Sequence, residues 1–99
     1  MEKLNEARWV VLFISKKRKQ IKGYSDMLRR MMEKVKEIPG FIGFQSFSDE
    51  QNRGITISFW KDKPAIKQWK MDADHIVAQN RGREDWYMEY QLFICSIAD

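Results

Sequence analysis

The chain has 99 residues, of which 43% are hydrophobic and 32% are charged. This composition predicts one globular domain over residues 1–99 and excludes a disordered or fibrous chain. No apolar run approaches the ~20 residues that a membrane-spanning helix needs. The polar N-terminus is unlike a signal peptide, so we expect a cytoplasmic protein without a membrane segment.

The net charge of +4 comes from one short segment. Lys16, Lys17, Arg18 and Lys19 follow one another, and without them the basic residues would equal the 14 acidic ones. We expect this segment to form a solvated loop. The alternative is a patch that binds phosphates or an acidic partner.

The first half of the chain predicts a strand followed by a helix. Residues 8–15 are β-branched and aromatic with no breaker, and both alternating faces of this strand are apolar. Apolar residues at helical spacing then predict a helix from Tyr24 to Ile38, with Gly23 or Ser25 at its start. Pro39 and Gly40 end it, because proline cannot continue the helical hydrogen bonding.

The second half predicts a hairpin, a helix and a long strand. Residues 41–48 and 55–60 are predicted strands joined by the polar turn 49–54, which makes them antiparallel. Asp62 is the expected N-cap of the second helix, which closes near residues 80–82. Residues 86–97 predict the last strand. It contains Cys95, the single cysteine, which excludes an internal disulfide and which we expect to be a buried small hydrophobe rather than a reactive thiol.

The predicted order β-α-β-β-α-β is the ferredoxin-like α+β arrangement, a four-stranded antiparallel sheet with two helices on one face. The other face would expose several large side chains, each worth about 1.5–3 kcal/mol if buried. Soluble monomers seldom expose such a surface. We therefore expect the free face to pack on a second sheet in a C2 homodimer.

The order of several motifs resembles a known family. Residues 55–94 combine a strand ending in Phe59 and Trp60, a helix with a tryptophan, a histidine-containing segment and an aromatic final strand. This is similar to the second half of the antibiotic biosynthesis monooxygenase family. Pro39-Gly40-Phe41, followed by Gly43, resembles the link between the family's first helix and second strand. The likeness extends over residues 8–97.

The resemblance implies a homodimer with a shared β-barrel and a pocket in each subunit between helices and sheet. It also implies oxidation of a small aromatic molecule, such as a quinol or a polyketide-like compound, by O₂ without a prosthetic group. That chemistry asks for an apolar aromatic pocket with a few polar groups. We expect no cofactor and no metal, because one histidine and one cysteine do not build a typical metal site.

Two residues are predicted to be catalytic. Trp69 matches the family's helix tryptophan and would stack on a flat substrate, although its helical phase equally suits a core residue. His75 is the only side chain with an unperturbed pKa near neutrality, which suits acid–base chemistry. On a straight helix His75 faces away from Ile66, at ~100° per residue. It reaches a pocket only if the helix breaks near residues 72–74, and the alternative is a surface or capping histidine.

Five further residues are predicted to bind the substrate: Tyr24, Trp60, Arg83, Trp86 and Tyr87. Arg83, together with Arg81, would attract an anionic or enolate oxygen. Both arginines would alternatively pair with the acidic residues that follow them. The aromatic members would line the pocket or only pack in the core.

Three other functions compete with this interpretation. A haem-degrading branch of the family carries an asparagine on its first strand and a ligating histidine on its helix. Here residues 8–15 hold no asparagine and the helix position holds Gln79, which argues against haem unless His75 is the ligand. RNA-recognition motifs share the element order, but their glycine-aromatic element would lie on the wrong strand, and Ile42 would turn alternate side chains to the wrong face. A dimeric small-molecule-binding module without catalysis stays open.

Overall fold

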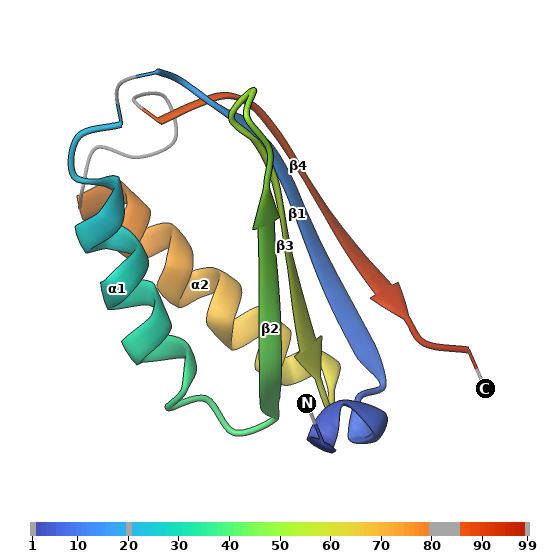
Figure 1. The fold of residues 1–99 in the computed structure, drawn as a ribbon. Coiled ribbons are helices and arrows are strands. Elements are labelled where there is room, and N and C mark those ends of the chain that lie inside the picture. The colour runs from blue at the N-terminus through green and yellow to red at the C-terminus, as the bar shows by residue number, and fades with distance from the viewer. Residues whose placement is uncertain (1, 20, 80–85, 99) are drawn as a thin grey trace.

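A computed structural model describes residues 2–19, 21–79 and 86–98, and the side chains of residues 2 and 74–79 lie outside that description. Its four-stranded antiparallel sheet has the order β2-β3-β1-β4, with α1 and α2 on one face (Figure 1). The elements are η1 (Glu2–Glu6), β1 (Trp9–Lys17), α1 (Tyr24–Val35), β2 (Phe41–Ser48), β3 (Arg53–Trp60), α2 (Lys63–Gln79) and β4 (Tyr87–Ser96). The predicted ferredoxin-like fold is confirmed.

The first strand extends into the basic segment. Lys16 and Lys17, expected in a loop, belong to β1 and pair with residues of β3 and β4. The backbone N–H of Lys17 donates to the carbonyl of Asn52 at 2.9 Å. The neighbouring strands offer these partners, so the sheet overrides the loop-like composition. The loop prediction was therefore wrong for these two lysines.

The connection from α1 to β2 explains the proline-glycine pair. α1 ends at Val35, before the predicted Ile38, and the chain turns toward β2. Gly40 has φ +97°, and a Cβ at this position would lie 2.9 Å from the Cβ of Ala65. The link therefore runs against the start of α2, and glycine is needed both for the backbone angle and for the close approach.

The expected start of α2 is also present. A side-chain oxygen of Asp62 accepts a hydrogen bond of 2.9 Å from the backbone N–H of Ala65, which is the predicted N-cap. Within the described residues, neither α1 nor α2 combines the length and the apolar character of a membrane-crossing helix.

A bulge in β2 sets the directions of its aromatic side chains. Phe41 pairs with Trp60 and Gly43 pairs with Phe59, so Ile42 is an extra residue in the ladder. As a result, Phe41 and Phe44 both lie on the face of the sheet that α1 and α2 cover, and Gly43 lies on the opposite face.

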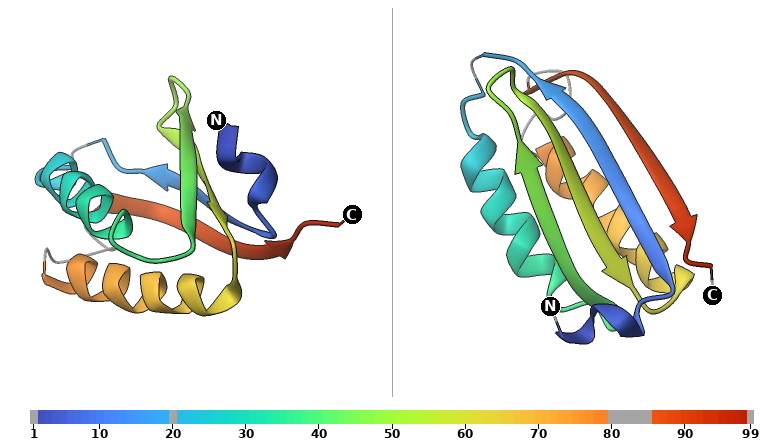
Figure 2. Two further views of the ribbon diagram at one scale, coloured as in Figure 1. Left: turned by 90° about the horizontal axis from the view of Figure 1, so that it is seen from below. Right: turned by 45° about the vertical axis from the view of Figure 1, so that its right-hand side comes forward.

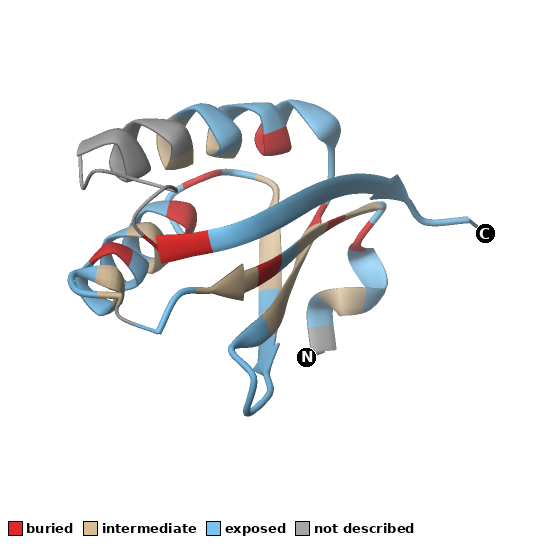
Figure 3. Ribbon diagram, turned by 90° about the horizontal axis from the view of Figure 1, so that it is seen from above, coloured by how far each residue is buried: buried red, intermediate tan, exposed pale blue. Residues whose placement is uncertain are grey.

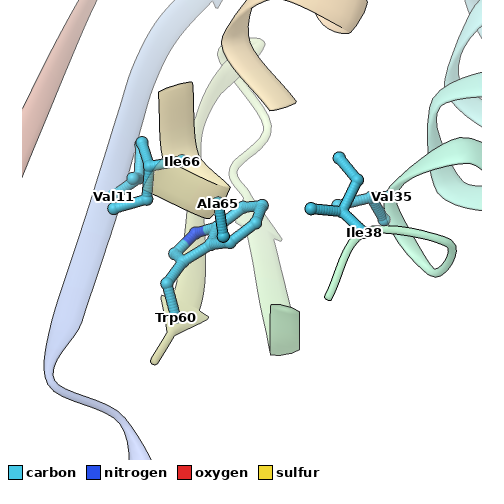
Figure 4. Close-up of a cluster of buried hydrophobic side chains, with 6 residues drawn as sticks. All are labelled: Val11, Val35, Ile38, Trp60, Ala65 and Ile66. Carbon is cyan, nitrogen blue, oxygen red and sulfur yellow. The ribbon is translucent and has the colours of Figure 1, made fainter. Parts of the chain in front are cut away.

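Two clusters of buried side chains join the helices to the sheet. The first, here called the core cluster, comprises Val11, Val35, Ile38, Trp60, Ala65 and Ile66 (Figure 4). The second centres on Met27, Trp86 and Tyr87, packed against Phe13 and Tyr24 among others. Figure 3 colours short buried stretches of the helices and the sheet red, while most of β4 is exposed.

The face of the sheet opposite α1 and α2 is apolar, as predicted. This open face carries Val10, Leu12, Ile14, Phe47, Ile55, Ile57, Phe59, Phe93 and Cys95, which the strand registers place on one side. Ile14, Phe47 and Phe93 are exposed. η1 lies on this side of the sheet (Figure 2), where Leu4 approaches Gly43.

β4 departs from the expectation that α1 and α2 cover one whole face. Leu92 and Ile94 lie on the helix side of the sheet, opposite Phe13 and Val11 on β1, and are nevertheless exposed. Cys95, on the other face, is also exposed, so the prediction of a buried cysteine was wrong. Leu92 and Ile94 are exposed because β4 is an edge strand that the helices do not cover, whereas Cys95 is exposed because it faces away from both helices.

Candidate functional site: an aromatic cluster with two tyrosine hydroxyls

The structure divides the aromatic residues that were predicted for the site, catalytic and substrate-binding, between two places. Tyr24, Trp86 and Tyr87 come together with two residues that the sequence did not single out, Phe13 and Tyr90. We call these five the aromatic cluster. Trp60 and Trp69 lie instead in and against the core cluster.

The aromatic cluster forms where three elements meet. The end of β1 runs antiparallel to the beginning of β4, which puts Ser15 opposite Tyr90 and Phe13 opposite Leu92. α1 starts at Tyr24 and brings that ring 5.9 Å from the ring of Tyr87. The ring of Phe13 meets that of Tyr87 edge-on, with 5.4 Å between the ring centroids, and stacks with that of Tyr90, with 5.8 Å between the centroids. Such ring pairs stabilise each other by about 0.5–1.5 kcal/mol beyond their burial.

Two hydroxyl groups meet inside this cluster. The phenol of Tyr87 donates to the oxygen of Tyr24 at 3.2 Å. Tyr87 is buried and Tyr24 is half-buried, so the pair lies between the interior and the surface. A phenol can accept one hydrogen bond and donate another, so Tyr24 retains a proton for a third group.

Trp86 has a different role in the same place. It is 2% exposed, and its indole N–H donates to the carbonyl of Lys22 at 3.0 Å. This bond ties the start of β4 to the loop before α1. The side chain therefore supports the position of Tyr24 and presents little surface to a ligand, in contrast to its predicted direct role.

Trp60 also differs from its predicted role. It is 0% exposed, and its indole N–H donates to the hydroxyl of Ser58 at 2.9 Å. Phe41 packs edge-on against it at 5.2 Å. Its packing and its hydrogen bond are both satisfied within the protein, so the structure places Trp60 in the core rather than on a surface that a substrate touches. Trp69 is half-buried against the same cluster.

The predicted roles of His75 and Arg83 stay predictions. α2 continues through residues 72–74 to Gln79, so the helix break on which a pocket-facing His75 depended is not present. The side chain of His75, and Arg81 and Arg83 altogether, lie outside the described residues. Within the described part of the chain, no group of three or more potential metal ligands comes together.

A concave feature lies at the β2–β3 hairpin, away from the aromatic cluster. It is a depression of about 360 Å³ lined by Phe47, Ser48, Asp49, Arg53, Gly54 and Ile55. Asp49 accepts hydrogen bonds from the backbone N–H of Arg53 and of Gln51 and pairs with the Arg53 guanidinium at 2.8 Å. These contacts, the Arg53 backbone bond first, lower the pKa of Asp49 from its ordinary 3.8. A carboxylate held ionised in this way is a weak base, which makes the hairpin a poor place for proton transfer.

Sequence reasoning missed several residues that surround the tyrosine pair: Phe13, Ser15, Lys17 and Tyr90. Alternation along β1 does put Phe13, Ser15 and Lys17 on one face, and this signal was present in the sequence. The signal did not extend to Lys17, because the strand was expected to end at Ser15, and the position of Tyr90 depends on the register of β4.

Comparison with known proteins defines the class. The family model for antibiotic biosynthesis monooxygenase matches residues 8–81, and the chain belongs to this family. YqjZ of Bacillus subtilis (strain 168), described as uncharacterized, is 33% identical over 89 residues, which covers 90% of this chain and 78% of that protein. The jasmonate monooxygenase ABM of Pyricularia oryzae is 27% identical over 75 residues, covering 74% of this chain and 35% of that protein.

Solved structures give the same fold. SnoaB from Streptomyces nogalater, a cofactor-independent oxygenase, superposes in a mutant form with a TM-score of 0.74 over 94% of this chain and 95% of that chain. The sequence identity is 10%, so this likeness shows the fold alone.

Proposed function

We propose that this protein is a monooxygenase that oxidises a small aromatic molecule with O₂ and without a prosthetic group. Family membership and the activity of one relative, the jasmonate monooxygenase from Pyricularia oryzae, support an oxygenase. The observation that carries the proposal for this chain is the aromatic cluster. It joins ring surfaces to a hydroxyl pair at the boundary between core and solvent.

The proposed chemistry asks little of the protein. A phenol-like substrate loses a proton and becomes electron-rich enough to reduce O₂ itself. One oxygen atom becomes the carbonyl of a quinone at a ring carbon that bears one hydrogen, and the other leaves as water with that hydrogen and the hydrogen of the phenol O–H. The four electrons come from the substrate, so the step needs no external reductant.

Specific residues would assist this reaction. Phe13 and Tyr90 offer ring faces to a flat substrate, and the Tyr24 hydroxyl would donate to the oxygen on which negative charge develops. His75 and Trp69 keep their predicted roles as hypotheses from the sequence alone: the helix break that would turn His75 toward a pocket is not present, and Trp69 packs against the core cluster. A site closed to water would strengthen each of these interactions.

A homodimer through the open face is part of this proposal. Nine apolar residues share that face, and α1 and α2 lie on the other one. Burying such side chains against a second sheet would stabilise the pair by about 1.5–3 kcal/mol per large residue. A symmetric contact of this kind would give each protomer the same partner surface.

Oxygen consumption tests the proposed activity. We would measure uptake with a panel of quinols and polycyclic phenols for the wild type and for Tyr24→Phe, Trp69→Phe and His75→Ala. We expect saturable uptake, with kcat about 10²–10³-fold lower when the Tyr24 donor is removed. Met71→Leu, on the exposed side of α2, is the control that should keep full activity.

The outcomes separate the candidate functions. Binding of these compounds without oxygen uptake would contradict catalysis and assign a small-molecule-binding module. A difference spectrum on addition of haemin, with a Soret shift that His75→Ala abolishes, would favour the haem-degrading branch instead.

A further inference from the structure

The basic end of β1 contains a cation placed beside the aromatic cluster. Lys17 lies on the same face of the sheet as Ser15 and Phe13, with its ammonium 5.9 Å from the centre of the Tyr24 ring. Lys16, one residue earlier, lies on the open face. The side chains of these two adjacent lysines therefore point to opposite faces of the sheet, and only Lys17 lies on the face of Tyr24 and Tyr87.

The Lys17 ammonium is not neutralised by a neighbour that the structure describes. The side chain is half-buried, and among the described residues no carboxylate lies within 4.0 Å of its Nζ. Residues 8–25 include no acidic residue at all. A contact with an aromatic ring compensates a cation only partly, by about 0.5–1 kcal/mol at exposed sites.

The fold leaves room for this ammonium. A Cβ at Gly54 would lie 3.2 Å from Lys17 Nζ and 3.9 Å from the hydroxyl oxygen of Ser15. The absence of a side chain at Gly54 thus lets the Lys17 side chain lie across β3, toward the helix side of the sheet.

Tyr24 adds a second donor to the same place. Its oxygen accepts from Tyr87, and no acceptor for its own proton is found among the residues described. An ammonium and a phenolic proton are therefore both available beside one aromatic ring. Together these groups match an oxyanion, since charge-assisted hydrogen bonds favour ionised acceptors over neutral ones.

We propose that the ligand of this site is an aromatic compound carrying an ionised oxygen, with Lys17 as its counter-ion and Tyr24 as its hydrogen-bond donor. The ring would contact Phe13 and Tyr90, and its oxyanion would point toward the end of β1. This inference rests on the proposed aromatic site and adds the charge of the ligand and the residue that selects it. The oxyanion is either a carboxylate or an ionised phenol.

Calorimetric titration tests the charge requirement with matched probes. 2-Naphthoate carries the anion and methyl 2-naphthoate is its neutral analogue of similar shape. We expect the wild type to prefer the carboxylate, and Lys17→Met to lose about tenfold to a hundredfold in its affinity for 2-naphthoate alone. Lys16→Met removes an equal charge from the opposite face of the same strand and should leave both affinities within about twofold, as expected for a screened surface charge.

A second probe distinguishes the two sources of the oxyanion. The absorbance of 4-nitrophenol reports its ionisation directly. If the site selects phenolates, the bound probe ionises at lower pH than the free one in the wild type, and this shift is lost in Lys17→Met. If the site selects carboxylates, only 2-naphthoate shows the dependence on Lys17.

The failure of this inference differs from the failure of the proposed function. Equal affinities for the carboxylate and the ester, unchanged in Lys17→Met, would overturn the inference and leave an aromatic site in place. Equal losses of affinity for 2-naphthoate in Lys17→Met and Lys16→Met would overturn it as well, because they would indicate a long-range electrostatic effect of the basic segment rather than a contact with Lys17. Binding of neither naphthalene probe nor 4-nitrophenol, together with no oxygen uptake, would contradict both. Thermal melts of each variant verify that the fold is intact.

Discussion

The core cluster and the aromatic cluster both place aromatic side chains between the helices and the sheet, but they differ in exposure and in hydrogen bonding. In the core cluster, Trp60 is completely buried and its one polar atom is bonded within β3. In the aromatic cluster, Phe13 and Tyr24 stay half-exposed, two hydroxyls meet, and a lysine lies over a ring. In the core cluster, the indole N–H of Trp60 is therefore already bonded within the protein. The aromatic cluster retains donors and ring surface, which is what a binding site needs.

The largest effect is expected from breaking the core cluster. Trp60→Ala should lower the free energy of unfolding by about 3–5 kcal/mol, because it removes a large side chain from a filled interior. Urea denaturation followed by circular dichroism measures this loss. Met71→Ala, on an exposed position of α2, should change it by less than about 0.5 kcal/mol. A similar small loss for Trp60→Ala would show that the core has been placed wrongly.

The next effect concerns the open face and the proposed dimer. Phe93→Glu should weaken dimerisation about a hundredfold or more, since it would bury an unpaired charge between two sheets. Leu92→Glu is the matched control, because Leu92 is 42% and Phe93 46% exposed, on opposite faces of β4. Light scattering at micromolar concentration should find a dimer for the wild type and for Leu92→Glu. A monomeric wild type would remove the dimer from the proposal.

A smaller change in stability is expected at the aromatic cluster. Tyr24→Phe removes one hydroxyl and keeps the ring, so unfolding should change by only about 0.5–1.5 kcal/mol. Oxygen uptake should nevertheless fall steeply. This dissociation of activity from stability, set beside Trp60→Ala, sharpens the contrast between the two regions. A Tyr24→Phe variant with normal turnover would assign the hydroxyl pair to structure alone.

The smallest effect is a pH dependence at the hairpin. The pKa of Asp49 is lowered in the folded state, so its contribution to stability is present above the unfolded value near 3.8 and is lost as pH falls through the folded value. Asp49→Asn keeps an acceptor but loses the charge. Its melting temperature should lie slightly below that of the wild type at pH 7, and the difference should shrink below pH 3.8. A difference that stays constant to lower pH would contradict this assignment.

Local sequence signals predicted most of the architecture and part of the site. Asp62 marked the start of α2 correctly, because capping acts within a few residues, whereas α1 ends at Val35, three residues before the end predicted from Pro39 and Gly40. Cys95 was predicted to be buried but is exposed on the open face, because the composition of β4 does not reveal which of its residues face away from the helices.

The candidate site could be predicted only in part for a related reason. Tyr24 and Tyr87 were identified as aromatic residues of a pocket, but not their contact. That contact depends on the register between β1 and β4, which includes a shift next to Lys17. Lys17 itself was hidden inside a basic run for which composition alone predicts a loop. Long-range pairing, rather than propensity, decided the outcome.

A crystal structure with a bound polycyclic phenol tests the central claim most directly. We expect the aromatic ring to lie against Phe13 and Tyr90, with its oxygen within hydrogen-bonding distance of Tyr24. A ring bound at the β2–β3 hairpin, with the aromatic cluster unchanged, would contradict that claim.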